Sequence, residues 1–203
     1  MLTRFGNSTD ISDILLLQEH NLYGNLSEQQ YSSGFVTTPF SVAQLESLIA
    51  DDGVFVAVSD AKLVGYLLAG TWQYYSAWPI FPYMVSRFPL PGPQGKTITA
   101  DNSFQYGPIC IAQDHRGTSV FPALFECMRI HFSRRFPIGY TFINRVNQRS
   151  YVAHTRKLGL QVFDQFEFGG NSFYGLAFDT KQSVIDSHTP DGLEPSGRSG
   201  NGS

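Results

Sequence analysis

Four stretches of the chain carry either the hydrophobic spacing of one helix face or the residues that begin and end a helix. Asp10 stands at the N-cap position of the first stretch, and Ser41 and Gln44 form a capping-box pattern at the start of the second. Asn147 is the expected N-cap of the last stretch, which Gly159 closes. The pattern therefore predicts helices over residues 10–20, 42–50, 120–136 and 147–158.

Short apolar runs between these helices predict strands. They occupy residues 54–58, 63–69, 104–112, 140–143, 160–168 and 173–178. Turn sequences at 60–62 and 169–171 join two pairs of these strands as hairpins. The order helices, hairpin, strand, helix, strand, helix, hairpin predicts a mixed α/β domain around one central sheet.

Two segments depart from this pattern. Residues 72–102 mix prolines with Trp72, Tyr74, Tyr75 and Trp78. So long an aromatic connection is typical of a lid or binding loop, and also of an apolar cap over the core; both can hold at once. Residues 180–203 offer little to bury, which predicts a disordered tail after a single domain over 1–179.

Composition narrows the class of protein. A chain of 203 residues that is 42% hydrophobic and 14% aromatic can bury a core. A net charge of -3 argues against a nucleic-acid binder that depends on a positive field. Two cysteines exclude a disulfide framework and a four-thiolate zinc site, and we expect no metal. No apolar run approaches the roughly 20 residues that span a bilayer, so we expect a cytoplasmic protein without membrane contact.

The segment 109–130 runs from a strand through a loop directly into a helix. The first amides of a helix lack internal partners and stabilise anions, above all phosphates. Arg116 adds a positive charge beside them, and Gly117 lets the backbone approach a ligand closely. The segment predicts a phosphate site; an ordinary connection with one surface arginine is the alternative.

The last predicted helix carries polar residues where a core helix would be apolar. Asn147, Ser150 and His154 are spaced to share one face. Histidine exchanges protons near neutral pH, so this face can serve acid–base chemistry. A solvated face with a single surface histidine is the alternative.

Taken together, these features resemble the GNAT superfamily of acyl-CoA N-acyltransferases over about residues 10–178. Family members typically read Q/R-x-x-G-x-G/A in the first loop, then N-x-x-[S/A] and a helix ending near L-G-F. Arg116 matches the first loop position, and Asn147 and Ser150 match the second motif. Ser119 and Phe121 stand where small residues are usual, and one residue more than usual separates Asn147 from Gly159.

The resemblance implies a fold and a site. Two neighbouring parallel strands, 104–112 and 140–146, would splay apart to admit acetyl-CoA as co-substrate. His154 would donate a proton to the departing sulfur or would only orient Ser150, and no general base is evident. Cys110 lies in an apolar strand, which favours a buried, inert thiol over a nucleophile. The residues that would hold the cofactor are Ile109, Cys110, Ile111, Arg116, Gly117, Thr118, Ser119, Val120, Phe121, Asn147 and Ser150.

The implied activity is transfer of an acetyl group to the amine of a small molecule by direct attack. The aromatic residues of 72–102 would border the acceptor cleft. A monomer or homodimer is expected. The alternatives are a non-catalytic acyl-CoA-binding or sensing domain of the same fold, and an interaction domain with no such site.

Overall fold

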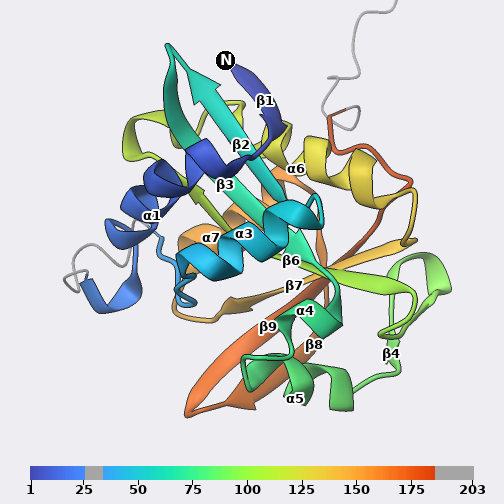
Figure 1. Ribbon diagram of the computed structural model, residues 1–203. Coiled ribbons are helices and arrows are strands. Elements are labelled where there is room, and N and C mark those ends of the chain that lie inside the picture. Colours follow the sequence, from blue (N-terminus) through green and yellow to red (C-terminus); the bar gives the residue numbers. More distant parts are fainter. Residues whose placement is uncertain (26–33, 186–203) are drawn as a thin grey trace, which may run out of the picture.

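Seven strands form one mixed sheet at the centre of the computed structural model, which describes residues 1–25 and 34–185. The strand order is β1-β2-β3-β6-β7-β9-β8 (Figure 1). Neighbouring strands are antiparallel except β6 and β7, which are parallel. The mixed α/β domain predicted from the sequence is confirmed.

The elements lie close to their expected bounds. The strands of the main sheet are β1 (Leu2–Phe5), β2 (Val54–Ser59), β3 (Lys62–Gly70), β6 (Ser103–Ile111), β7 (Ile138–Asn144), β8 (Gln161–Phe168) and β9 (Asn171–Asp179). The helices are α1 (Ile11–Glu19), α3 (Val42–Ala50), α4 (Trp72–Tyr75), α5 (Ile80–Ser86), α6 (Val120–Phe132) and α7 (Gln148–Val152). A π turn, Ala153–Lys157, continues α7.

The N-terminal caps agree with the sequence at two helices and differ at one. Ser41 and Gln44 form both halves of the capping box of α3, and Asn147 Oδ1 accepts from the Ser150 amide at α7. Asp10 does not cap α1 with its side chain. Its carboxylate instead accepts hydrogen bonds from Arg4 and from the Asn7 amide, so it ties β1 to the start of α1.

Helices cover both faces of the sheet. One face packs against α1, α3, α4 and α5, through Ile14, Leu45, Trp72 and Phe81 among others (Figure 1). The other face packs against α6, whose buried residues include Leu124, Phe125, Met128 and Phe132. The sheet therefore separates two apolar cores.

The parallel strands β6 and β7 separate after a short paired section. Ser103, Phe104 and Gln105 pair with Ile138, Gly139 and Tyr140, and no further pairs form although both strands continue. The register of β6 with β3 also shifts, between Tyr106 and Ile109, as at a β-bulge. Gly107 has φ +114, which side chains oppose, and Pro108 has no N–H to donate. This Gly-Pro pair explains locally why the pairing of β6 with β7 ends there. The expected separation of these two strands is confirmed.

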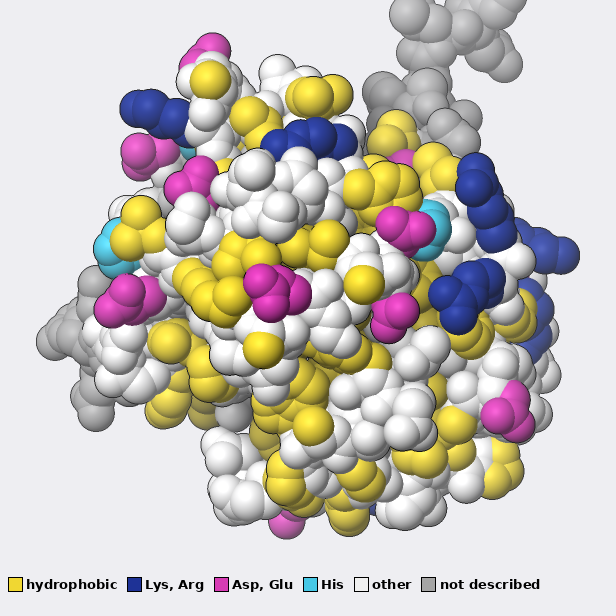
Figure 2. Space-filling view, viewed as in Figure 1, with side chains coloured by type: hydrophobic (Ala, Val, Ile, Leu, Met, Phe, Trp, Pro, Cys, Tyr) yellow, Lys and Arg dark blue, Asp and Glu magenta, His cyan; other side chains and the backbone are white. Residues whose placement is uncertain are grey.

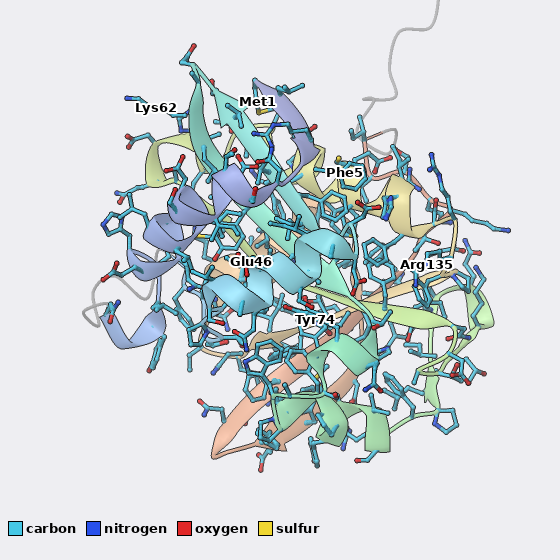
Figure 3. The ribbon with its side chains drawn as sticks, in the orientation of Figure 1. Met1, Phe5, Glu46, Lys62, Tyr74 and Arg135 are labelled. Atoms are coloured by element: carbon cyan, nitrogen blue, oxygen red, sulfur yellow. The ribbon has the colours of Figure 1, made fainter. Side chains whose placement is uncertain are left out.

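The 72–102 segment is a packed cap that contains structure of its own. It holds α4, α5 and a two-stranded ribbon, β4 (Leu90–Pro91) with β5 (Thr97–Ile98). Arg87 binds Asp164 of β8 through two hydrogen bonds, at 2.9 and 2.6 Å, and Lys96 pairs with Asp179 of β9. Tyr74, labelled in Figure 3, donates to the Gln44 carbonyl of α3. These contacts support the interpretation as a packed cap.

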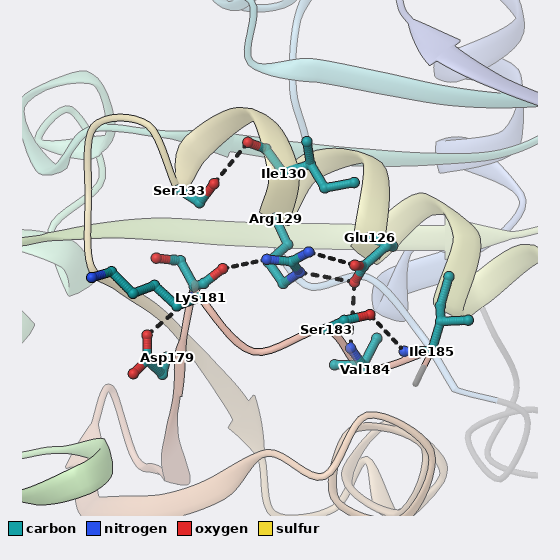
Figure 4. Close-up of polar contacts among 10 residues, drawn as sticks. Glu126, Arg129, Ile130, Ser133, Asp179, Lys181, Ser183, Val184 and Ile185 are labelled. Atoms are coloured by element: carbon teal, nitrogen blue, oxygen red, sulfur yellow. Dashed lines mark hydrogen bonds and ion pairs between the residues drawn. The ribbon is translucent and has the colours of Figure 1, made fainter. Parts of the chain in front are cut away.

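The chain stays packed beyond residue 179, where the sequence analysis placed the start of the tail. Thr180 and Val184 are buried. Arg129 of α6 donates to the Thr180 carbonyl and pairs with Glu126, whose carboxylate accepts from the Val184 amide (Figure 4). Residues 180–185 thus belong to the domain, and the rest of the predicted tail lies outside the described residues.

Charged side chains are unevenly spread over the surface. Figure 2 shows Lys and Arg side chains gathered at one edge, beyond the end of α6, where Figure 3 labels Arg135. Asp and Glu side chains are scattered over the rest of that face (Figure 2). No helix in the described ranges combines the length and apolarity needed to cross a membrane.

Candidate active site

Two adjoining cavities open where β6 and β7 separate. The smaller, about 80 Å³, lies in the gap itself, and the larger, about 420 Å³, extends toward the start of α6 and along α7. Residues that line both include Ile109, Asn147, Ser150 and His154. The splay therefore connects a roomy outer cavity to a narrow inner one.

The larger cavity is lined by four cationic residues and by no carboxylate from the described part of the chain. The four are Arg116, Arg149, Arg156 and Lys157. Arg116 is held in place because its Nε donates to the Ile111 carbonyl at 3.0 Å and its guanidinium also donates to Asn21 Oδ1. Burial lowers the pKa of Arg116, and the positive charge of Arg149 adds to this effect. So much unbalanced positive charge favours an anionic ligand.

The loop after β6 gives the cavity its rim. Gly117 has φ +85, a conformation that glycine adopts readily, and its carbonyl accepts from Lys157 Nζ at 3.2 Å. Thr118 and Ser119 are exposed at the turn, while Val120 is buried in the core under α6. Of the predicted cofactor residues, these last three do not line either cavity, and the others do.

Asn147 anchors the opposite wall. Its Nδ2 donates to the Phe35 carbonyl at 3.1 Å, and its Oδ1 accepts from the Ser150 amide at 3.2 Å. The side chain is buried, and it fixes the segment around Phe35 against the start of α7. The role at the cofactor arm that the resemblance gives to Asn147 stays a prediction.

The extra residue between Asn147 and Gly159 is taken up by the π turn at Ala153–Lys157. A π turn holds one residue more than the α-helical pattern allows, and such turns often occur at functional sites. Gly159 then ends the helix with φ +68. The insertion is therefore absorbed locally, and His154 stays on the wall of both cavities.

Known structures share this architecture. Neither a protein-family model nor a curated protein matches the sequence. An N-acetyltransferase from Staphylococcus aureus Mu50 aligns with a TM-score of 0.59 at 14% identity, over 88% of this chain and 98% of that one. A putative acetyltransferase from Salmonella typhimurium, solved with acetyl-CoA, gives 0.58 at 13% identity, over 88% and 93%. A GNAT superfamily phosphinothricin acetyltransferase from Sinorhizobium meliloti, in complex with AcCoA, gives 0.58 at 14%, over 88% and 87%.

The chain has the GNAT acetyltransferase fold. At identities this low the likeness is one of fold. What the site does must therefore be argued from its own residues.

Among the described residues, His154 is the titratable side chain shared by both cavities of this GNAT fold. It is only 3% exposed, and its ring lies against Phe121 and Tyr106. Nδ1 lies 2.7 Å from the Ser150 carbonyl, so the geometry assigns the proton to Nδ1 and leaves Nε2 as an acceptor. Burial lowers the pKa of His154 to about 4. The resting imidazole is neutral at pH 7, which changes the form that any catalytic role would take.

Cys110 is buried, and its Sγ lies 3.9 Å from the Leu17 carbonyl. Burial raises the pKa of its thiol to about 12, so the thiolate is scarce at neutral pH. The expected burial of this thiol is confirmed, and its inertness stays a prediction.

Several residues of the site were missed from the sequence. Three cationic residues follow Asn147 on one helix. Arg156 and Lys157 come seven and eight residues after Arg149, so a helical projection of the charged positions would have placed the three side chains together. Phe35 and Val36 come from a segment without regular structure and carried no such signal.

Proposed function

We propose that the protein transfers an acetyl group from acetyl-CoA to the amine of a small molecule. The observation that carries the proposal is the separation of β6 from β7 into a cavity lined by four cations. The cations suit the phosphates of coenzyme A, and the apolar walls from Phe35, Val36 and Ile109 suit its uncharged arm. Two of the structures that share the fold were solved with acetyl-CoA, which supports the proposal.

The chemistry is one substitution at the thioester carbon. The amine nitrogen forms a bond to that carbon, the carbon–sulfur bond breaks, and the proton lost by nitrogen ends on sulfur. Neutral His154 suits a relay in which Nε2 accepts the proton and then gives it to the thiolate. The sequence analysis gave His154 the role of proton donor, with orientation of Ser150 as the alternative. Because the resting ring is neutral, it must accept a proton before it can donate one.

A binding domain without catalysis is the second candidate. Phe121 is buried, lines the larger cavity and packs edge-on against His154 at a ring distance of 5.1 Å. No carboxylate base lines either cavity within the described residues. Both observations are compatible with a domain that binds acyl-CoA and leaves it intact.

A thiol-release assay separates the two candidates. With acetyl-CoA and a panel of primary amines, we expect release of free coenzyme A that depends on the amine concentration. The His154→Gln variant should lower kcat by about 100-fold or more, as is typical for loss of a proton-transfer group, while acetyl-CoA affinity stays within about twofold. Acetyl-CoA binding without release by any amine would leave only the binding domain.

A further inference from the structure

The smaller cavity differs from the larger one in its chemistry. Its aromatic walls come from Phe35, Phe40, Phe81 and Phe142. None of its described lining residues is Asp, Glu, Lys or Arg. Since His154 is neutral at pH 7, every polar side chain described on its walls is uncharged. If an acceptor molecule carried a charged group besides its reacting amine, that group would lose its hydration here without gaining a counter-charge.

Two buried polar atoms on residues that line this cavity have no hydrogen-bond partner in the described structure: the Gln105 side-chain oxygen, which can only accept, and the Tyr106 hydroxyl. Gln105 is 1% exposed and occupies the last paired position of β6 before the splay. Its Nε2 donates to the Tyr106 carbonyl at 2.8 Å, which fixes the orientation of the amide because a carbonyl oxygen has no proton to give. Its Oε1 has no hydrogen-bond partner in the described structure. A buried acceptor without a partner favours a ligand that supplies a hydrogen-bond donor.

The space beside Gln105 is kept open by the backbone. A Cβ on Gly107 would lie 3.5 Å from Thr141 Oγ1 and 3.9 Å from Gln105 Nε2, so the absent side chain leaves room there. The hydroxyl of the buried Tyr75 donates to the Gly107 carbonyl at 2.9 Å and holds this section of β6. The cavity is small, about 80 Å³. It admits an unhindered amine end and excludes a bulky one.

We propose that Gln105 positions the acceptor, and that the acceptor is a primary amine on an uncharged, apolar body. An N–H of the amine donates to Gln105 Oε1, while the apolar body lies among the phenylalanines. Gln105 takes no proton in the reaction; it orients the nitrogen. This inference rests on the proposed acetyl transfer and adds to it the class of acceptor.

Butylamine and 1,4-diaminobutane form a matched pair of probes, because they differ chiefly by a second ammonium group. We expect the wild-type kcat/KM, measured by thiol release, to favour butylamine by at least 30-fold. The Gln105→Met variant, similar in shape but without an acceptor, should lower kcat/KM for butylamine about 10-fold. The Gln105→Glu variant adds a counter-charge and should narrow the preference about 10-fold.

Acetyl-CoA affinity and the thermal midpoint serve as controls, since a merely structural role of Gln105 would change them. We expect both variants to bind acetyl-CoA as the wild type does. Equal kcat/KM for the two amines, or an unchanged value in Gln105→Met, overturns this inference and leaves acetyl transfer standing. Absence of release with every amine overturns both.

Discussion

Reversing two charges on α7 is expected to weaken acetyl-CoA binding at least 100-fold. Arg149 and Arg156 line the larger cavity, and both are exposed, so the Arg149→Glu/Arg156→Glu variant should fold normally. The double substitution removes two attractive charges and adds two repulsive ones. A 100-fold loss corresponds to about 2.7 kcal/mol of binding free energy. Isothermal titration calorimetry of acetyl-CoA into both proteins measures it.

A matched control lies elsewhere on the surface. Arg134 and Arg135 are exposed beyond the end of α6 and do not line either cavity. Figure 3 labels Arg135. Arg134→Glu/Arg135→Glu makes the same change in net charge, and we expect its affinity to stay within about threefold. The loss at α7 should shrink in high salt, because ions screen charges near the surface. Equal losses in the two variants would mean that net charge alone, and no local site, governs binding.

Acid is expected to destabilise the wild type more than a His154→Phe variant. Burial lowers the pKa of His154 from 6.5 in the unfolded chain to about 4 in the fold. Between these values the unfolded chain binds more protons than the folded one, so the free energy of unfolding falls as pH falls. The full difference of about 2.5 pH units corresponds to about 3 kcal/mol. His154→Phe keeps a ring against Tyr106 and Phe121 and removes the titration.

Denaturant unfolding at several pH values from 7 to 4 measures this difference. The wild type should lose about 3 kcal/mol more than His154→Phe across that window. His20, which is exposed, offers a control: His20→Gln should follow the wild type. Parallel curves for the wild type and His154→Phe would show that His154 is not held neutral by burial.

Much of the fold could be predicted from local pattern. The helical face of α6 and the capping box of α3 each depend on residues close together in the chain, so the sequence alone locates them. The short strand β1 was missed, because it is four residues long and is defined by its pairing with β2. The helices inside the cap at 72–102 were also missed, since they are stabilised by distant partners such as Asp164.

The candidate site divides in the same way. His154 and Arg116 could be found by motif and spacing, and the structure places both on cavity walls. The low pKa of His154 could not be predicted from the sequence, because it arises from burial against Phe121 and Tyr106. The unpaired oxygen of Gln105 likewise depends on where β7 turns away, which no local sequence pattern shows.

The central claim is that acyl-CoA enters the gap between β6 and β7, and amide signals in nuclear magnetic resonance spectra test it most directly. On addition of acetyl-CoA, we predict shifts at Ile109, Cys110 and Ile111 on β6 and at Gly117 on the cavity rim. Signals from β1, at the far edge of the sheet, should stay in place. Unchanged signals at β6 and Gly117 with millimolar acetyl-CoA, or shifts confined to other surfaces, would contradict the account.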